Sequence, residues 1–190
     1  MKRGRPRRLL DGRALDSKAP VTDLPRPDNG PTVDPARFRE GMSRVAGAVH
    51  VIATDGPAGR GGFTATAVAS VADTPPTLLV CANGTNRSCA SLLANGVFCV
   101  STLSAEDEAL AGAFSGRTGL YGEDRFRVGA WSRLVTGAPA LVSGLAAFDC
   151  RVVEARPVAT HVVILGEVVD VRVGADAQAL VYRGRRFHRL

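Results

Sequence analysis

Two segments of the sequence combine residue types that can hold a ligand. The first, residues 61–67 (G-G-F-T-A-T-A), carries small and hydroxyl side chains along one run. In an extended strand, such a run lets a flat ring lie against the backbone, where N–H groups and threonine hydroxyls bond its polar edge. The alternative interpretation is structural, because threonine is also a good strand former.

The second segment, residues 81–88 (C-A-N-G-T-N-R-S), joins an apolar run to an expected helix. The N-terminus of that helix, the guanidinium group of Arg87 and several hydroxyl or amide groups converge there. Proteins hold phosphate with helix N–H dipoles and a charged fork of this kind. The alternative is an ordinary polar loop in which a serine or threonine caps the helix.

The motifs of several large enzyme classes are missing from the chain. It has no G-x-S-x-G, no H-E-x-x-H and no G-x-x-x-x-G-K-[ST] motif. Residues 59–62 (G-R-G-G) lack the G-x-G-x-x-G spacing and do not open a helix, which excludes a Rossmann dinucleotide site. An apolar chain without an evident acid–base pair indicates either a binding module or chemistry carried by a cofactor.

The four cysteines do not form a metal-binding pattern. Cys81, Cys89, Cys99 and Cys150 contain no C-x-x-C pair, and the three histidines stand at no zinc-like spacing from them. Each cysteine has apolar neighbours in the sequence. We therefore expect buried free thiols and no metal site.

The composition is that of a globular protein with one folded domain. Of 190 residues, 45% are apolar and 22% are charged, and no apolar run approaches the roughly 20 residues that cross a bilayer. The basic N-terminus lacks the apolar stretch of a signal peptide, so we expect a cytoplasmic protein that does not bind membranes. The net charge of +6 suits small anionic ligands better than nucleic acid.

The N-terminal residues 1–31 differ in composition from the rest. They are rich in proline and carry eight lysine or arginine residues against four acidic ones, which predicts a disordered tail before a folded domain at residues 32–190. Residues 2–8 (K-R-G-R-P-R-R) resemble the AT-hook, whose arginines lie in the narrow minor groove of A·T-rich DNA. A DNA-binding regulator is therefore one alternative, and a solvated tail is the other.

Order is expected to begin at Asp34, whose carboxylate can cap a helix that has Pro35 at its first position. Phe38, Met42 and Val45 follow at helical spacing and predict an apolar stripe that faces a core.

The remainder of the chain is mostly extended, and no βαβ unit repeats. The pattern predicts a mainly β protein, a Greek-key β-barrel with a few short helices. The expected strands cover residues 49–54, 63–72, 77–81, 97–103, 146–157, 161–173 and 180–183, the expected helices residues 86–94 and 104–114, and a glycine-rich loop residues 112–127.

Taken together, these segments resemble the flavin reductase-like family, the small reductase partners of two-component flavin monooxygenases. The resemblance runs in order from Phe38 to the C-terminus. Its motifs are F-R-E-G-M-S-R-V-A-G-A-V-H-V-I-A-T (38–54), G-F-T-A-T-A-V-A-S-V (62–71), P-P-T-L-L-V-C (75–81), N-G-V-F-C-V-S-T-L (95–103), R-F (125–126), H-V-V-I-L-G-E-V (161–168) and L-V-Y (180–182). Within the family, T-D-G-P-A-G-R (54–60) and T-G-A-P (136–139) are similar to the FMN reductases of the pyrimidine-utilisation pathway.

The resemblance implies a split β-barrel that forms a homodimer with the flavin near the subunit interface. It assigns the isoalloxazine ring to Gly62, Phe63, Thr64, Thr66 and Ala67. It assigns the ribityl-phosphate end to Asn83, Thr85, Arg87 and Ser88. It also implies that Phe114, Ser115 and Gly116 close over the flavin from the glycine-rich loop.

A histidine of the family touches the nicotinamide nucleotide and belongs to a G-D-H motif before a long strand. This chain has A-T-H at residues 159–161, so His161 is retained and the Gly-Asp pair is not. The alternative for His161 is a structural histidine at a strand end.

The activity implied by the resemblance is reduction of FMN or FAD by NADH or NADPH, with reduced flavin supplied to a monooxygenase. Hydride would pass from C4 of the nicotinamide to N5 of the flavin, so the protein must stack two rings rather than supply an acid or base. Backbone N–H groups near the N1–C2 edge would stabilise the charge gathered on reduction. The alternatives are a non-catalytic flavin- or haem-binding split barrel in electron transfer or sensing, and a pyridoxamine-phosphate-oxidase-like enzyme.

Overall fold

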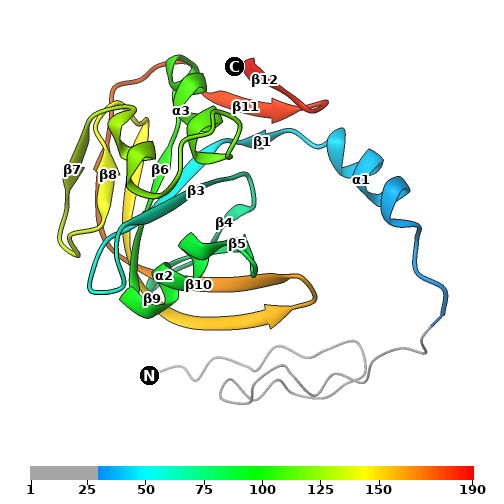
Figure 1. Ribbon diagram of the computed structural model, residues 1–190, viewed down its shortest axis with the longest axis horizontal. Helices are drawn as coiled ribbons and strands as arrows, with labels where there is room; N and C mark the ends of the chain where they lie inside the picture. Colours follow the sequence, from blue (N-terminus) through cyan, green and yellow to red (C-terminus); the bar gives the residue numbers. More distant parts are fainter. Residues whose placement is uncertain (1–29) are drawn as a thin grey trace, which may run out of the picture. The chain divides into compact units, whose positions relative to one another are not determined.

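The computed structural model describes residues 30–190 of the chain, which divides into two units, Met1–Arg37 and Phe38–Leu190 (Figure 1). Asp34 caps helix α1 (Pro35–Ser43) as predicted, because its carboxylate accepts two backbone N–H bonds from the first turn. The AT-hook-like segment and all but the last two residues of the predicted tail lie outside the described residues.

Strands are the main secondary structure of the second unit, which confirms the mainly β prediction. The strands are β1 (Gly47–Ala48), β2 (His50–Thr54), β3 (Gly61–Ala65), β4 (Val68–Asp73), β5 (Pro76–Asn83), β6 (Val97–Thr102), β7 (Trp131–Arg133), β8 (Pro139–Leu141), β9 (Ala146–Val158), β10 (His161–Val173), β11 (Leu180–Arg183) and β12 (Arg186–Arg189). The other helices are α2 (Arg87–Asn95) and α3 (Glu108–Phe114), with short 3-10 helices η2 (Ala105–Asp107) and η3 (Gly122–Arg127). No helix within residues 30–190 is long and apolar enough to cross a membrane.

Seven strands form one sheet in the order β3-β2-β6-β9-β10-β5-β4, and every neighbouring pair is antiparallel. β3 and β4 lie at opposite edges of this order, although only Thr66 and Ala67 separate them in the chain. The sheet must therefore curl until its two edges approach. At this junction the Ala67 carbonyl accepts a hydrogen bond from the Cys81 N–H at 3.0 Å. The curled sheet is the split barrel, and Thr66 and Ala67 lie at its split.

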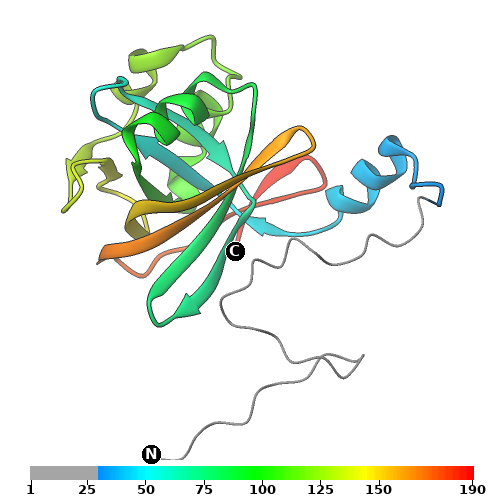
Figure 2. The same ribbon diagram turned by 90° about the horizontal axis from the view of Figure 1, so that it is seen from below.

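The prediction of a single strand at residues 63–72 is wrong. The chain forms two strands there, and each pairs with a different neighbour, β3 with β2 and β4 with β5. Residues on both sides of the break are good strand formers, so the local pattern does not reveal where the chain changes partners. In Figure 2 the hairpin β4–β5, coloured green, runs beside the long hairpin β9–β10, coloured yellow to orange.

The barrel interior is filled by apolar side chains from the sheet and from α2. Ile52, Phe98 and Leu92 are almost completely buried in one cluster. The ring of Phe98 lies directly against Gly166 of β10, where any Cβ atom would collide with it. Gly166 is therefore required for packing rather than for a ligand.

A second sheet brings the C-terminus beside the start of the domain. β11 pairs with β1 and with β12, so the red hairpin and the cyan strand lie side by side (Figure 1). Tyr182 of β11 stands opposite Gly47, and Phe187 of β12 packs edge-on against Tyr182. Leu180 is buried in the same cluster as Leu110 of α3, so the C-terminal hairpin and α3 share a core.

The apolar stripe of α1 is exposed, which corrects the expectation that it faces a core. Phe38, Met42 and Val45 are 58%, 51% and 57% exposed in the single chain. Helical spacing identifies a face that can be covered, but it does not identify what covers that face.

Candidate functional site

The predicted ring-binding segment lies along a free edge of the large sheet. Among residues 30–190, β3 pairs only with β2, so the N–H and C=O groups of every second residue along it point away from the sheet. Both α2 and α3 pack beside β3, and the strand ends at the split of the barrel. Residues 61–67 therefore combine free backbone groups with small side chains, as ring binding requires.

Gly62 and Phe63 face the interior of the protein. A Cβ atom on Gly62 would lie 2.7 Å from the ring of Phe114, so that ring covers the glycine. The side chain of Phe63 is 6% exposed and belongs to the barrel core. Phe114 is buried against Phe126 and Trp131 rather than placed over a cleft. The side chains of Gly62, Phe63 and Phe114 thus offer a ligand no polar group.

Three predicted residues share a cleft of about 180 Å³, which we call the ring cleft. Thr64, Thr66 and Ser115 bring hydroxyl groups to it, and the C-terminal hairpin and Arg117 of the glycine-rich loop also line it. The ring cleft is lined by Val49, Thr64, Ala65, Thr66, Ser115, Arg117, Tyr182 and Phe187. The structure brings the edge of β3, the glycine-rich loop and the chain's C-terminus together.

The glycine-rich loop is held by local bonds on both sides of the ring cleft. The Thr64 hydroxyl donates to the Ala111 carbonyl of α3 at 2.8 Å, which ties β3 to the helix before the loop. Ser115 ends α3 and donates from its hydroxyl to the Gly112 carbonyl at 3.0 Å. Gly116 follows with a φ of +81°, a left-handed conformation that favours glycine.

A second cleft, of about 290 Å³, lies where β3 begins. We call it the arginine corner, because Arg60, Arg87 and Arg125 line it together with Ser88. None of the described residues that line it is acidic. The side chain of Asn86 caps α2 by accepting the Ser88 N–H at 2.9 Å. Three guanidinium groups and the start of a helix make this corner suitable for a phosphate.

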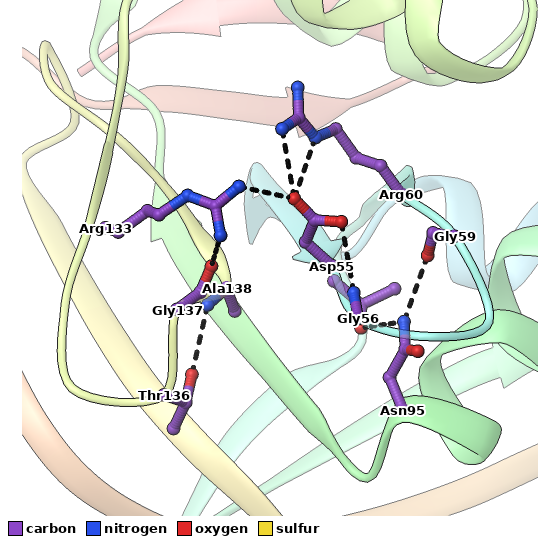
Figure 3. Close-up of polar contacts among 10 residues, drawn as sticks. Asp55, Gly56, Gly59, Arg60, Asn95, Arg133, Thr136, Gly137 and Ala138 are labelled. Atoms are coloured by element: carbon purple, nitrogen blue, oxygen red, sulfur yellow. Dashed lines mark hydrogen bonds and ion pairs between the residues drawn. The ribbon is translucent and has the colours of Figure 1, made fainter.

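Arg60 is fixed in the arginine corner by the turn between β2 and β3 (Figure 3). Oδ2 of Asp55 accepts from Nη2 of Arg60 at 3.0 Å and from Nη2 of Arg133 at 2.7 Å. The Asn95 side chain bonds two backbone groups of the same turn. The Arg60 guanidinium also lies 5.4 Å from the ring centroid of Phe126. The T-D-G-P-A-G-R motif is thus a braced turn that positions one arginine.

The T-G-A-P motif is structural as well. Thr136 donates from its N–H and its hydroxyl to the carboxylate of Asp149, at 2.6 and 2.5 Å, and Asp149 is completely buried. Arg133, which reaches Asp55, also donates to the Gly137 carbonyl at 3.2 Å (Figure 3). Two motifs that are far apart in the sequence therefore meet through one arginine.

Asn83, Thr85 and His161 line neither the ring cleft nor the arginine corner. The side-chain oxygen of Asn83 accepts from the N–H and hydroxyl of Thr85, both at 2.9 Å, and the two residues are exposed. His161 stands opposite Asn83 in the β10–β5 register, with Nδ1 2.9 Å from the Thr160 hydroxyl. His161 is exposed and does not line the ring cleft.

The A-T-H motif forms the tight turn between β9 and β10. Ala159 has a φ of +49° in that turn. This region favours glycine, because a Cβ atom there is crowded by the backbone. The turn explains why a glycine suits this position in the related motif.

His50 is a candidate that the sequence interpretation did not find. It lines a cavity of about 600 Å³ together with Thr66 and Ala67, and its Nδ1 is 3.1 Å from the Thr102 hydroxyl. Burial lowers the pKa of His50 to about 4, so its imidazole is neutral at neutral pH. A single histidine in an apolar strand is no binding signal by itself, and only its place beside the split of the barrel draws attention to it.

The cysteines follow the prediction of free thiols. Cys89, Cys99 and Cys150 are buried, and Cys81 is half-buried. Burial raises the pKa of Cys99 to about 12 and also raises the pKa values of Cys89 and Cys150, so these thiols stay protonated. Within residues 30–190, no group of three or more His, Cys, Asp or Glu side chains could hold a metal ion.

In a comparison with protein families, residues 42–190 match the flavin reductase like domain. Two curated relatives are both described as FMN reductase (NADH) RutF. The chain is 51% identical to the protein of Methylorubrum populi over 158 residues, which cover 83% of this chain and 77% of that one. It is 47% identical to the protein of Variovorax paradoxus over 165 residues, which cover 86% and 91%.

Solved structures agree with this match. BorF, the flavin reductase component of a bacterial two-component tryptophan halogenase, is 30% identical with a TM-score of 0.76, over 83% of this chain and 98% of that one. The NADH:FAD oxidoreductase SgcE6 of Streptomyces globisporus C-1027 is 27% identical with a TM-score of 0.76, over 84% and 97%.

Proposed function

This chain belongs to the flavin reductase-like domain family, and we propose that it is an NADH-dependent FMN reductase that supplies reduced flavin to a partner monooxygenase. The curated relatives support FMN and NADH as the reactants. BorF supports a separate flavin-using partner, because it is the reductase component of a two-component system. We place the enzyme in the cytoplasm.

The observation that carries this proposal is the edge of β3, which joins the arginine corner to the ring cleft. Gly61 lines the corner and Thr66 lines the cleft, and five residue steps of a strand span about 17 Å. FMN has a phosphate at one end of a ribityl chain and a flat ring at the other. Along β3, the protein has the cationic arginine corner at one end, where the phosphate would bind, and the narrow ring cleft at the other end, where the ring would bind.

In this arrangement the side chains of Arg87 and Ser88 hold the phosphate, with Asn83 and Thr85 at the rim. Thr64, Thr66, Ala67, Ser115 and Gly116 border the ring. Gly62 contributes its outward backbone N–H group, and Phe63 supports this stretch of β3 from the core. His161 contacts the nicotinamide nucleotide. Each of these roles belongs to the proposal.

The chemistry asks the protein to orient two reactants rather than to transfer a proton. When bound, the flavin supplies the hydride acceptor, N5, for the hydride on C4 of the nicotinamide. The edge of β3 fixes the plane of the ring, and its outward N–H groups stabilise negative charge on the pyrimidine edge. The neutral imidazole of His50 adds no charge near the ring.

We also propose that the active form is a homodimer. The ring cleft, about 180 Å³, is smaller than the roughly 300–1,000 Å³ of ordinary ligand pockets, so a single chain covers only part of a flavin. The chain also exposes a separate apolar surface, where Val71 is 52% and Val171 is 44% exposed beside a cleft of about 230 Å³ lined by Leu78 and Phe148. A second copy that covers such surfaces would complete the site.

FMN-dependent oxidation of NADH tests the proposal. The purified protein should oxidise NADH in the presence of catalytic FMN and air, and FAD and NADPH should serve less well. A non-catalytic flavin or haem carrier would bind its ligand without this turnover, which would refute the activity. Light scattering after size-exclusion chromatography should give the mass of two chains, and a monomer mass would refute the dimer.

A further inference from the structure

Arg117 of the glycine-rich loop lies on two aromatic rings of the C-terminal hairpin. Its guanidinium carbon is 5.9 Å from the ring centroid of Tyr182 and 5.4 Å from that of Phe187. Nη2 donates to the Tyr182 hydroxyl at 3.3 Å, and the two rings meet edge-on with their centroids 5.3 Å apart. The rings hold the guanidinium in place and leave its charge uncompensated.

The charge of Arg117 is available to a ligand. Within residues 30–190, no carboxylate lies within ion-pair distance of Arg117. The hairpin that carries the rings is itself basic, with arginines at positions 183, 185, 186 and 189. Arg117 lines the ring cleft together with Thr64 and Thr66. A fixed cation therefore borders the place proposed for the flavin ring.

The FMN phosphate does not account for this cation. That phosphate has its own site in the arginine corner, at the opposite end of β3 from Thr66. The other reactant of the proposed reaction, NADH, is a dinucleotide whose pyrophosphate carries two negative charges a short distance from the nicotinamide. When the nicotinamide stacks on the flavin ring, this pyrophosphate must lie near the border of the ring cleft.

We propose that Arg117 binds the pyrophosphate of NADH, and that Tyr182 and Phe187 are positioning residues that hold its guanidinium toward the ring cleft. This inference rests on the proposed function. It gives the C-terminal hairpin a role in selecting the hydride donor. It also separates two contacts with NADH, the pyrophosphate at Arg117 and the nicotinamide nucleotide at His161.

The test compares two hydride donors in the full-length chain. Arg117→Ala should raise KM for NADH about tenfold or more, as expected for loss of a charge-assisted hydrogen bond, with kcat nearly unchanged. An N-benzyl dihydronicotinamide has no phosphate, and its kcat/KM should stay within about twofold of the wild-type value. FMN affinity, measured by flavin fluorescence, should also be unchanged.

Further variants distinguish the charge of Arg117 from the aromatic rings that position it. Arg117→Lys should recover part of the loss, because it keeps the charge without the fork. Phe187→Leu should give an intermediate KM for NADH and the same response to the phosphate-free donor. Arg127→Ala is the matched control, since Arg127 is exposed in the following segment and pairs with Asp124. It should leave both donors unaffected.

Two results would overturn the inference. Equal losses with NADH and with the phosphate-free donor would show that Arg117 supports the site as a whole. A weaker FMN affinity with an unchanged KM for NADH would place the flavin phosphate at Arg117. Failure of the proposed function has a different signature, because the wild-type protein would then show no FMN-dependent NADH oxidation at all.

Discussion

Nη1 of Arg125 donates a hydrogen bond to the carbonyl oxygen of Gly62 over 3.1 Å. The same guanidinium donates from Nε to the Leu120 carbonyl at 3.0 Å. One side chain thus fastens the glycine-rich loop to the edge strand on which the flavin is proposed to lie. Arg125 also lines the arginine corner. The same residue therefore holds the loop in position and is placed to bind the phosphate.

Replacing Arg125 by alanine should therefore loosen the loop and weaken FMN binding together. Hydrogen bonds to charged groups contribute about 1.5–3 kcal/mol, which corresponds to a loss of roughly tenfold or more in FMN affinity. Amide exchange at residues 115–122 should become faster in the same variant. Arg127→Ala should show neither effect. Weaker FMN binding with unchanged exchange would limit Arg125 to the phosphate.

Arg87 should act on the phosphate alone. Arg87→Ala removes an exposed guanidinium from the first turn of α2, and FMN affinity should fall by about tenfold or more. Riboflavin lacks the phosphate, so its affinity should change much less. Titration of both flavins by fluorescence quenching decides the matter, and equal losses would place Arg87 outside the phosphate site.

Local signals in the sequence identify the elements around the site. Asn95-Gly96 predicts the end of α2, and Gly96 does adopt the left-handed cap with a φ of +69°. Ser104 and Asp107 form the predicted capping box before α3. These features depend on neighbouring residues only, which is why a sequence can reveal them.

Features that depend on residues far apart in the chain could not be predicted from the sequence pattern. The partner change at Thr66 and Ala67 follows from closure of the barrel, and no local breaker marks it. Arg60 and Arg125 join the arginine corner only because the β2–β3 turn and the glycine-rich loop fold back to α2. The burial of Phe63 and Phe114, likewise, is decided by packing across strands. The family resemblance indicates which sequence positions contact the flavin, and the structure shows which side chains at those positions line a cleft.

The turn between β9 and β10 contains backbone strain that a substitution can relieve. Ala159 has a φ of +49°, so Ala159→Gly should stabilise the protein by about 0.5–1 kcal/mol, after allowance for the greater freedom of glycine in the unfolded chain. Urea unfolding measures the change. Ala155→Gly is the matched control within strand β9, and it should destabilise by about the same amount. A loss of stability in both variants would contradict the strained turn.

His50 should make stability depend on pH in the acid range. Burial lowers its pKa from 6.5 to about 4, so the unfolded chain takes up a proton at a higher pH than the folded protein does. The contribution of neutral His50 is complete above pH 6.5 and is lost as the pH falls toward 4. The loss is roughly 1.4 kcal/mol per pH unit and at most about 3 kcal/mol in total.

His50→Asn keeps a polar group that can bond to Thr102 and removes this titration. Its free energy of unfolding should fall less steeply between pH 6.5 and 4 than that of the wild-type protein, as measured by urea unfolding at several pH values. His188→Asn, at an exposed position of the C-terminal hairpin, should retain the wild-type slope. If His50→Asn also retained it, the pKa of His50 would not be lowered in the folded protein, and its imidazole would be protonated below about pH 6.5. His50 would then bring a positive charge to the cavity it shares with Thr66 and Ala67, where such a charge would favour an anionic reduced flavin.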